Sequence, residues 1–441
     1  MSTNPEVVED TGAIVNYRLN DKPSVPVTAL LGLQHTLAMF VGNITPPIIV
    51  AAALGFDVMT TAFVISMTLF TAGLSTWIQA KKIGPIGSGM CVVQGTSFLF
   101  IPLAIQAGQI GGWPLVLGMA LATSPVEMIL SRFMDQARKI FAPVVIGSFL
   151  TCSGLILMSA GMASLCGGNG AEDFGNPRYI ALGMFVLVLI VIFNRFGKGL
   201  VQTASIAIAI VAGYLVSIPM GLVDFSSVSE AGWFMAPIPF KFGLSFSWTL
   251  LIPWIIAYLL SGLESIGDLT GVAQSSGEPI TGEIHKKRLE GGMLGDAVGS
   301  AIASIFGTLP NITFTQNIGV IQLTKVGARV VGYSCGIILM ILGLLPKVGA
   351  LISIMPQPVL GGATIPMFGL VAVAGIRIVL SGGFTERNAF IFAISVAMGM
   401  GVQYFPEAVS QLPEWLEMIF AQPLATTAIF AIVLHLITPD P

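Results

Sequence analysis

The chain has 441 residues, of which 54% are hydrophobic and only 9% are charged. Soluble domains usually have about 25% charged residues, so this composition excludes an ordinary globular protein and predicts an integral membrane protein. The net charge of −3 says little about partners, and no basic tract suggests a nucleic-acid partner. The four cysteines match no metal-ligand spacing, so no metal site is expected.

Apolar segments recur along the whole chain, after a polar stretch at residues 1–24 that we expect to be a cytoplasmic tail. Because a membrane helix needs about 20 apolar residues, candidates can be located directly. The long ones begin near Val25, Val58, Pro114, Val144, Ile180, Ala204, Trp248, Gly332, Thr364, Ala389 and Pro423. A shorter segment runs from Met293 to Phe306, and two interrupted segments span residues 87–105 and 310–323. The sequence thus predicts about 14 crossings.

The two interrupted segments are third and tenth in order, so they occupy equivalent positions in two halves of seven. An odd number of crossings in each half inverts the second half relative to the first. We therefore predict an all-α polytopic membrane protein with a seven-plus-seven inverted repeat, divided in the polar stretch 224–241. Interrupted segments in matching positions indicate the binding site of a transporter, and two independent re-entrant loops are the alternative.

Positive charges indicate the orientation of the segments. With the N-terminus inside, most basic residues fall in loops predicted to be cytoplasmic, as the positive-inside rule requires. These loops contain Lys81, Lys82, Arg132, Arg138, Lys139, Arg195, Lys198, His285 to Arg288, Lys325, Arg329 and Arg377. The loops predicted outside contain Arg178, Lys241 and Lys347. Both termini are therefore expected to be cytoplasmic.

Ionisable residues inside apolar segments are the first candidates for a functional site. Glu264 and Asp268 are four residues apart and share one helix face, where a carboxyl group can carry a proton or accept hydrogen bonds from a ligand. Asp268 could instead be a helix-end residue that faces water. Asp296 could bond to the broken backbone of the tenth segment or relay protons. His35 could titrate or join two helices.

The stretch TQNIGVIQLTK, residues 315–325, places polar side chains between two apolar blocks. Free backbone groups at membrane depth are tolerated only against protein or a cavity. Gln316 offers an amide donor and acceptor that fit the edge of a lactam or imide ring, and Gly319 permits close backbone approach. Phe98 and Phe314 could stack on a planar ligand. A small, flat, polar heterocycle suits these groups, and a packing of satisfied amides is the alternative.

Motifs for covalent or hydrolytic catalysis do not appear in the sequence. We find no nucleophile elbow, HExxH helix or phosphate-binding glycine loop. No catalytic residue is therefore predicted. Active transport would have to depend on an ion gradient rather than on ATP.

These residues resemble the nucleobase–ascorbate transporter family, also called nucleobase:cation symporter 2 or the xanthine/uracil permeases. The family signature is Gln or Glu, Asn, any residue, Gly, four further residues, Thr, and then Arg, Lys or Gly. The residues from Gln316 to Lys325 match it completely. The family's Gln-His pair resembles Gln34 and His35, and its acids in the eighth and ninth helices resemble Glu264 and Asp296. The likeness extends over nearly the whole chain.

The resemblance implies a core domain, from the first to fourth and eighth to eleventh segments, and a gate domain from the rest. The expected ranges are 25–135 and 241–355 for the core and 136–240 and 356–441 for the gate. Short β-stretches in the third and tenth segments would hold the substrate. Family members of bacteria couple uptake to protons, form homodimers and move the core against the gate in an elevator-like step.

Carried onto this chain, the resemblance implies a specific set of site residues. Substrate would bind to Glu264, Gln316, Ser97, Phe98, Phe314 and Thr315. Proton coupling and support of the site would depend on Glu264, Asp268, Asp296, His35 and Asn317. Asn317 is expected to shape the tenth segment rather than to hold substrate. No cofactor is expected, because the proton gradient supplies the energy.

Details of the sequence are similar to the purine branch of the family. Gln rather than Glu at position 316 and phrases such as PIPFKFGLSFSW resemble the xanthine and urate permeases of enterobacteria. Ser97 replaces the Asn typical of those xanthine permeases and would leave room for the extra oxygen of urate. Lys325 in place of Gly also resembles broader-range or urate-type members. A strict xanthine preference is therefore not expected.

We accordingly predict a multi-pass protein of the bacterial cytoplasmic membrane that imports xanthine, urate or both with protons, as a homodimer in the lipid bilayer. One alternative is a permease for uracil or another nucleobase. A second is an anion transporter of the same fold, although sulfate-permease-like proteins lack the Gln-Asn signature and usually have a large soluble C-terminal domain. A third is a non-transporting receptor or an intramembrane enzyme.

Overall fold

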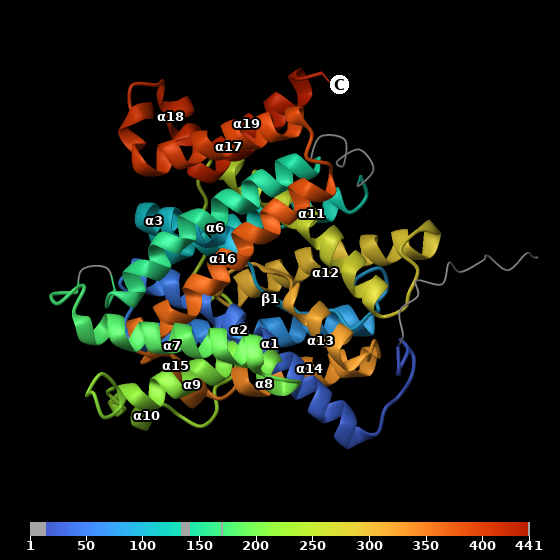
Figure 1. Ribbon diagram of the computed structural model, residues 1–441, viewed down its shortest axis with the longest axis vertical. Helices are drawn as coiled ribbons and strands as arrows, with labels where there is room; N and C mark the ends of the chain where they lie inside the picture. The colour runs from blue at the N-terminus through green and yellow to red at the C-terminus, as the bar shows by residue number, and fades with distance from the viewer. Residues whose placement is uncertain (1–14, 134–141, 169–170, 440–441) are drawn as a thin grey trace, which may run out of the picture.

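The computed structural model describes residues 15–133, 142–168 and 171–439, which are mostly helical (Figure 1). The first half contains α1 (Val25–Ala53), α2 (Val58–Lys81), β1 (Gln94–Thr96), η1 (Phe98–Phe100), α3 (Ile101–Thr123), α4 (Pro125–Leu130), α6 (Pro143–Leu165), α7 (Pro177–Phe196), α8 (Leu200–Thr203), α9 (Ser205–Ser217) and α10 (Ser226–Glu230). The second half contains α11 (Leu251–Ser275), α12 (Gly282–Ile305), β2 (Asn311–Thr313), α13 (Gln316–Thr324), α14 (Arg329–Gly343), α15 (Pro346–Ser353), α16 (Gln357–Ser381), α17 (Glu386–Tyr404), η2 (Pro406–Val409), α18 (Glu414–Phe420) and α19 (Pro423–Ile437). Most of the predicted N-terminal tail, and the basic residues Arg138 and Lys139, lie outside the described residues.

Several long helices begin where the sequence places proline or a capping side chain. α6, α7 and α19 begin at Pro143, Pro177 and Pro423. Proline suits the first helical position because the N–H that it lacks would have no partner there. At the start of α2, the Asp57 carboxylate accepts a hydrogen bond from the backbone N–H of Thr60 at 3.4 Å. These starts lie within a few residues of the predicted segment starts.

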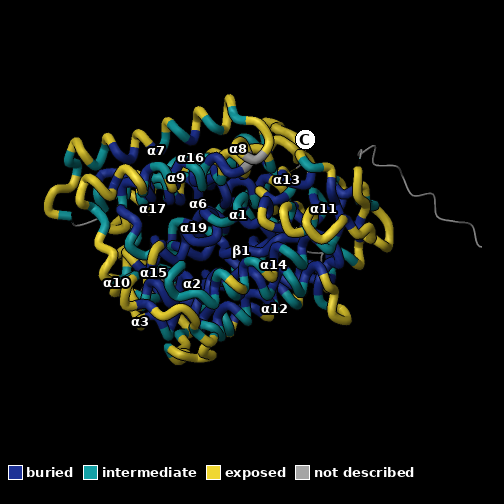
Figure 2. Tube along the Cα trace, turned by 90° about the horizontal axis from the view of Figure 1, so that it is seen from below, coloured by how far each residue is buried: buried dark blue, intermediate teal, exposed yellow. Residues whose placement is uncertain are grey.

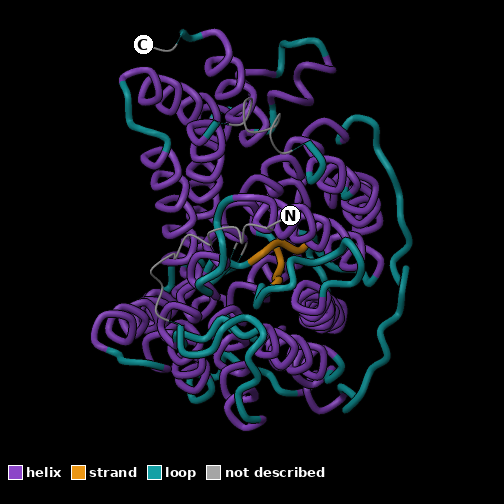
Figure 3. The backbone as a smooth tube through the Cα atoms, turned by 90° about the vertical axis from the view of Figure 1, so that its right-hand side faces the viewer, coloured by secondary structure: helices purple, strands orange, loops and turns teal. Residues whose placement is uncertain are grey.

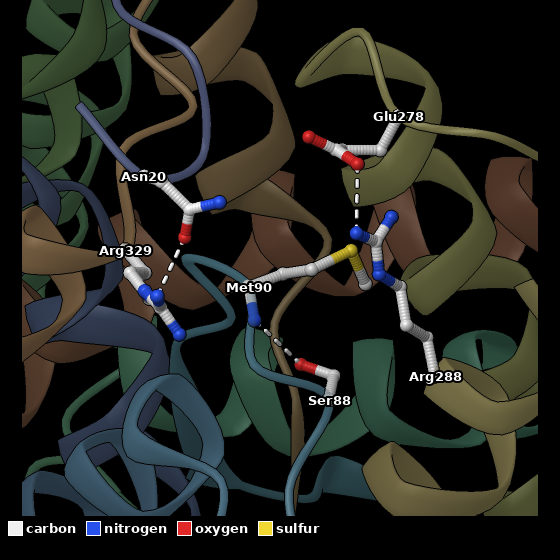
Figure 4. A network of polar contacts seen from close by, with 6 residues as sticks. All are labelled: Asn20, Ser88, Met90, Glu278, Arg288 and Arg329. Carbon is white, nitrogen blue, oxygen red and sulfur yellow. Dashed lines mark hydrogen bonds and ion pairs between the residues drawn. The ribbon is translucent and has the colours of Figure 1, made fainter. Parts of the chain in front are cut away.

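The predicted start of the ninth segment was wrong. α12 begins at Gly282 rather than near Met293, so the stretch from His285 to Arg288 occupies a helix and not the expected loop. Arg288 is paired with Glu278 of the preceding turn at 2.7 Å (Figure 4). The prediction failed because it required apolar length, whereas the first turns of α12 are charged and are stabilised by such contacts.

Two other segments also differ from their predicted starts. α16 begins at Gln357, earlier than the predicted Thr364. α3 is broken just before Pro114, where a new segment was predicted, because Gly111 and Gly112 leave the helical conformation. Gly112 has a φ of +71°, which glycine adopts without steric cost.

Among the described residues, seven helices are long and apolar enough to cross a membrane, or eight if the bent pair α14 and α15 counts as one span. α9 and α19 are shorter apolar helices. The protein is therefore a multi-pass membrane protein. Only 22% of the apolar stretch of α7 is buried, against 72% for α1 and α2, and Figure 2 accordingly colours most of α7 as exposed or intermediate.

The helices pack in two main groups. α2 lies along α14 and α15, and α1 also packs on α14. α6 lies along α16, which also contacts α7, while α17 packs on α19. Glycines allow the backbones of α2 and α14 to approach closely: a Cβ atom built on Gly336 would lie 2.7 Å from the carbonyl oxygen of Gly73. Small residues thus determine the separation of these helices.

Two short strands pair in the middle of the molecule (Figure 3). β1 and β2 are antiparallel and entirely buried, with Gln94 opposite Thr313 and Thr96 opposite Asn311. The ladder continues at both ends, because the N–H of Ser97 donates to the carbonyl of Pro310 at 2.9 Å and the N–H of Phe314 donates to that of Val93 at 2.9 Å. We call β1 and β2 the strand pair. Their mutual pairing satisfies backbone groups that no membrane helix could satisfy here.

The segment before α1 is tied to the chain that follows α13. The N–H of Gly327 donates to the carbonyl of Tyr17 at 2.9 Å, and the Arg329 guanidinium donates to the Asn20 side chain at 2.5 Å (Figure 4). Lys325, which directly follows α13, has a left-handed backbone with a φ of +58°. The end of α13 is thus held from outside the helix.

The α2–α14 contact can be tested by overpacking. We expect Gly336→Ala to lower the melting temperature of the detergent-solubilised protein, because the added methyl group must push α14 away from α2. Overpacking of this kind typically costs about 1–3 kcal/mol. Gly267→Ala in α11 is the matched control, since a Cβ there meets no atom within 4 Å. Equal melting of the Gly336 variant and the wild type, measured by size-exclusion chromatography after heating, would contradict the close packing.

Candidate functional site

A cavity of about 300 Å³ lies beside the strand pair, with walls from α1, α6, α9, α11, α13 and α16. The six residues predicted to bind substrate all line it: Ser97, Phe98, Glu264, Phe314, Thr315 and Gln316. Five of these come from the two interrupted segments and one comes from α11. The structure therefore brings together residues that lie more than 200 positions apart in the chain.

The strand pair determines which residues reach the cavity. Ser97 directly follows β1 and Phe314 directly follows β2, and each strand then leads into a helix. α13 begins at Gln316, next to the cavity, so its first N–H groups and their partial positive charge lie near the site. A short strand followed by a short helix thus presents both backbone and side-chain polar groups to a ligand.

Glu264 and Gln316 present free polar groups to the cavity. Within the described part of the chain, neither side chain has a hydrogen-bond partner, although both line the cavity wall. A carboxylate can accept hydrogen bonds from ring N–H groups, and an amide can donate and accept at once. The arrangement is therefore suited to the polar edge of a heterocyclic ring.

The two predicted aromatic residues have fixed positions in the cavity wall. The Phe314 ring lies over Gly95, since a Cβ on Gly95 would be 2.6 Å from the ring. Phe98 makes an edge-to-face contact with Phe368 of α16, with ring centroids 5.8 Å apart. Glycine at position 95 is thus required for Phe314 to reach its place.

Asp268 is not the water-facing helix-end residue that was one alternative. Its side chain is buried, and one carboxylate oxygen accepts a hydrogen bond from the Thr315 hydroxyl at 2.8 Å. Asp268 does not line the cavity itself. Its hydrogen bond connects it to Thr315, which does line the cavity.

Asp296 is completely buried and accepts hydrogen bonds from four surrounding elements. Its donors are the amides of Gln79 in α2 and Gln94 in β1, each at 2.6 Å, the Thr313 hydroxyl in β2 at 3.0 Å, and the Ser265 hydroxyl in α11. The backbone N–H of Thr313 also points to it, at 3.4 Å. This is the contact to the broken backbone that the sequence suggested. Because Gln94 and Thr313 are partners in the strand pair, Asp296 holds both strands at once.

His35 joins α1 to α13 through Asn317. The Asn317 amide nitrogen donates to Nδ1 of His35 at 2.9 Å and to the His35 carbonyl at 3.1 Å. Since an amide nitrogen can only donate, Nδ1 accepts and neutral His35 carries its proton on Nε2. Neither residue lines the cavity. Both support the segment that carries Gln316.

Sequence reasoning missed three buried amides that shape the site. Asn43 accepts hydrogen bonds from the backbone N–H and the hydroxyl of Thr96, at 2.8 and 3.1 Å, while Gln79 and Gln94 bind Asp296. Each is a polar residue in an apolar segment, which is the same signal that identified His35. Arg377 was expected in a loop but lies within α16 and lines the cavity.

Comparison with known proteins agrees with these features. The family model Xan_ur_permease, described as Permease family, matches residues 27–408. Xanthine permease XanP of Escherichia coli K12 is 39% identical over 436 residues, which cover 96% of this chain and 94% of that protein. Xanthine permease XanQ of the same strain is 36% identical over 444 residues, 98% of this chain and 95% of that protein.

The fold is also similar to that of the murine Slc26a9 anion transporter in its inward-facing state. The TM-score is 0.62 at 12% identity, over 95% of this chain and 68% of that chain. At this identity the likeness shows the fold alone. The family model and the two permeases extend along nearly the whole sequence, and this protein belongs to the nucleobase–ascorbate transporter family, the xanthine/uracil permeases.

Proposed function

We propose that the protein imports purine nucleobases, namely xanthine, urate or both, across the bacterial cytoplasmic membrane together with protons. The observation that carries this proposal is the free carboxylate of Glu264 and the free amide of Gln316 in one cavity of about 300 Å³. That volume is at the lower end of the usual range for ligand sites, about 300–1,000 Å³, and suits a single small ring system. The names of the related xanthine permeases support the same substrate class.

In this proposal the ring edge of the base lies between Glu264 and Gln316. Glu264 accepts from a ring N–H, and Gln316 donates to a carbonyl oxygen while accepting from a second N–H. Phe98 and Phe314 cover the ring faces. The small side chain of Ser97 leaves space beside the base, where an extra oxygen would fit.

Glu264 is also the proposed site of proton coupling. Its carboxyl group is the one acid that faces the cavity within the described residues, so it can exchange protons with water that enters with the substrate. Asp268, Asp296, His35 and Asn317 support this site through their hydrogen bonds. The proton gradient supplies the energy, and no cofactor is required.

For the architecture we propose about 14 crossings in two inverted halves of seven, with the strand pair in the third and tenth. The core would comprise residues 25–135 and 241–355, and the gate residues 136–240 and 356–441. The packing of α2 on α14, and of α6 on α16, supports this division. The boundary between 135 and 136 lies outside the described residues. The cavity has walls from both domains, so an elevator-like movement of the core would carry the substrate past the gate.

We further propose that the protein is a homodimer with both termini in the cytoplasm. The orientation follows from the excess of basic residues in the loops predicted inside. The dimer follows from the family resemblance.

An anion transporter of the same fold is the second candidate. The position of the cationic Arg377 on the cavity favours it. Labelled xanthine uptake with unlabelled urate, uracil, guanine, hypoxanthine or sulfate as competitors separates the candidates. Competition by urate supports the purine proposal, and competition by uracil favours a broader nucleobase permease. No xanthine uptake from a well-expressed protein would favour the anion transporter.

Glu264→Gln should abolish proton-coupled uptake of xanthine while expression stays normal. The amide cannot take up a proton, and it places a donor where the base presents its own N–H. Uptake of labelled xanthine into cells is measured with and without a protonophore. Glu283→Gln, the same change at an exposed position of α12, serves as the control. Normal, protonophore-sensitive uptake by the Glu264 variant would remove this residue from the mechanism.

Ser97→Asn should lower urate uptake more than xanthine uptake. The larger amide would occupy the space that we assign to the extra oxygen of urate, and a difference in size of about one methylene group changes discrimination by roughly 10- to 200-fold. The ratio of the two uptake rates in cells with equal expression measures the effect. An unchanged ratio would show that Ser97 does not determine substrate preference.

A further inference from the structure

Glu127 in α4 is a buried acid that neither the cavity nor the proposed coupling residues include. Its side chain is 0% exposed, and neither carboxyl oxygen has a hydrogen-bond partner among the described residues. It does not line the cavity. Native proteins rarely bury polar groups without partners, and such a group calls for an explanation.

Glu127 faces the side of α11 that is turned away from the substrate cavity. A Cβ built on Gly262 would lie 3.3 Å from Cγ of Glu127, so the missing side chain at this position makes room for the acid. Gly262 and Glu264 are two residues apart, which places them about 200° apart around a helix. Glu127 of α4 therefore contacts the side of α11 that is opposite to the side carrying Glu264.

Among the described residues, the titratable groups that act on Glu127 are all acidic. Asp296 of α12, and Glu264 and Tyr258 of α11, act on it electrostatically. α3, which also packs on α4, contains no titratable residue. An ionised carboxylate is costly in such a place, because the part of the chain that the structure describes offers it neither a hydrogen-bond donor nor a cation. The surroundings therefore favour a Glu127 that holds a proton.

Asp296 has the opposite surroundings. Amide and hydroxyl donors from Gln79, Gln94, Thr313 and Ser265 point at its two oxygens. An ionised carboxylate can accept hydrogen bonds from all of these donors, whereas a protonated carboxyl group could accept fewer of them. Two neighbouring acids whose environments favour different protonation states are a recognised arrangement for moving protons.

Ser265 lies between the two acids. Its hydroxyl is a neighbour of Glu127 but donates its single proton to Asp296, which leaves the Glu127 oxygens without a donor. The Ser265 oxygen keeps a lone pair that a protonated Glu127 can use. A protonated Glu127 that turned toward Ser265 and donated to this lone pair would complete a path of proton donors and acceptors to Asp296.

We propose that Glu127 is a proton-storing residue of the transport cycle and exchanges its proton with Asp296 through the Ser265 hydroxyl. In the transfer, the O–H bond of Glu127 breaks and an O–H bond forms on Ser265 Oγ. The proton that Ser265 held moves to Oδ2 of Asp296, and the total charge does not change. This inference rests on the proposed proton coupling and adds a residue to it.

The transfer would act on the substrate site through the strand pair. A protonated Asp296 is a weaker acceptor, so its bonds to Gln94 and Thr313 would loosen. These two residues are partners in the strand pair, whose ends carry Ser97 and Phe314. The position of one proton would thereby affect the geometry of the site without any contact to the substrate.

The first test reads the protonation state directly. Infrared difference spectra of wild type minus Glu127→Gln, in membranes at neutral pH, should contain the C=O stretch of a protonated carboxylic acid. The difference spectrum for Glu283→Gln, an exposed acid, should lack it. No such band for Glu127 would overturn the proposal, since the residue would then be an ionised carboxylate solvated by buried water.

The second test reads the role in transport. Glu127→Gln should bind xanthine like the wild type but show proton-driven uptake that is lower by roughly tenfold or more, with a flattened pH profile. Ser265→Ala should reproduce this loss and Ser265→Thr should restore uptake, which keeps the test decisive if Glu127→Gln folds poorly. A merely structural Glu127 would change yield and leave the pH profile of uptake as it is, which would refute the relay.

The wild type separates this inference from the proposed function. If a protonophore does not reduce xanthine uptake by the wild type, proton coupling itself is refuted, and the relay with it. Protonophore-sensitive uptake, combined with an unaltered pH profile in Glu127→Gln and Ser265→Ala, would refute the relay alone.

Discussion

The site depends on the hydrogen bonds that the Asp296 carboxylate accepts. Two three-residue strands from distant parts of the chain cannot form a stable sheet by themselves, since even a two-stranded hairpin is marginal. Here a buried carboxylate binds a side chain from each strand, Gln94 and Thr313, and also Gln79 of α2. These contacts hold the strands together and place Ser97 and Phe314 on the cavity. The buried charge is tolerated because it has so many donors.

The remaining polar residues secure the same construction from other sides. Asn43 fixes the backbone at Thr96, and His35 and Asn317 connect α1 to α13. Most of the polar network thus surrounds the cavity rather than entering it. Among the residues that the structure describes, a few polar groups on the cavity, such as those of Glu264 and Gln316, have no partner and stay free for a ligand. Rigid support with few free groups is what a selective site requires, because a loose site could not distinguish ring edges.

Features that depend on the pattern of residues along the chain could be predicted from the sequence. Glu264, Asp296 and the stretch from Gln316 onward stand out because polar residues interrupt apolar runs, and all proved to lie at the cavity or to hold its walls. Partnerships could not be predicted in the same way: Gln79 binds Asp296 across 217 positions. Glu127 escaped notice because a single acid near a segment end is common. α12 was predicted too short because its charged first turns gave no apolar signal.

The left-handed backbone of Lys325 affects how the family signature should be understood. A helix commonly ends with one residue in this conformation, where glycine avoids the steric penalty that other residues meet. The N–H of Lys325 closes the last turn of α13 on the carbonyl of Ile321 at 2.7 Å. A basic side chain here also complements the negative end of the helix dipole. The choice between Lys and Gly at the last signature position therefore concerns how the helix is terminated, and backbone energetics can select it independently of which base the cavity accepts.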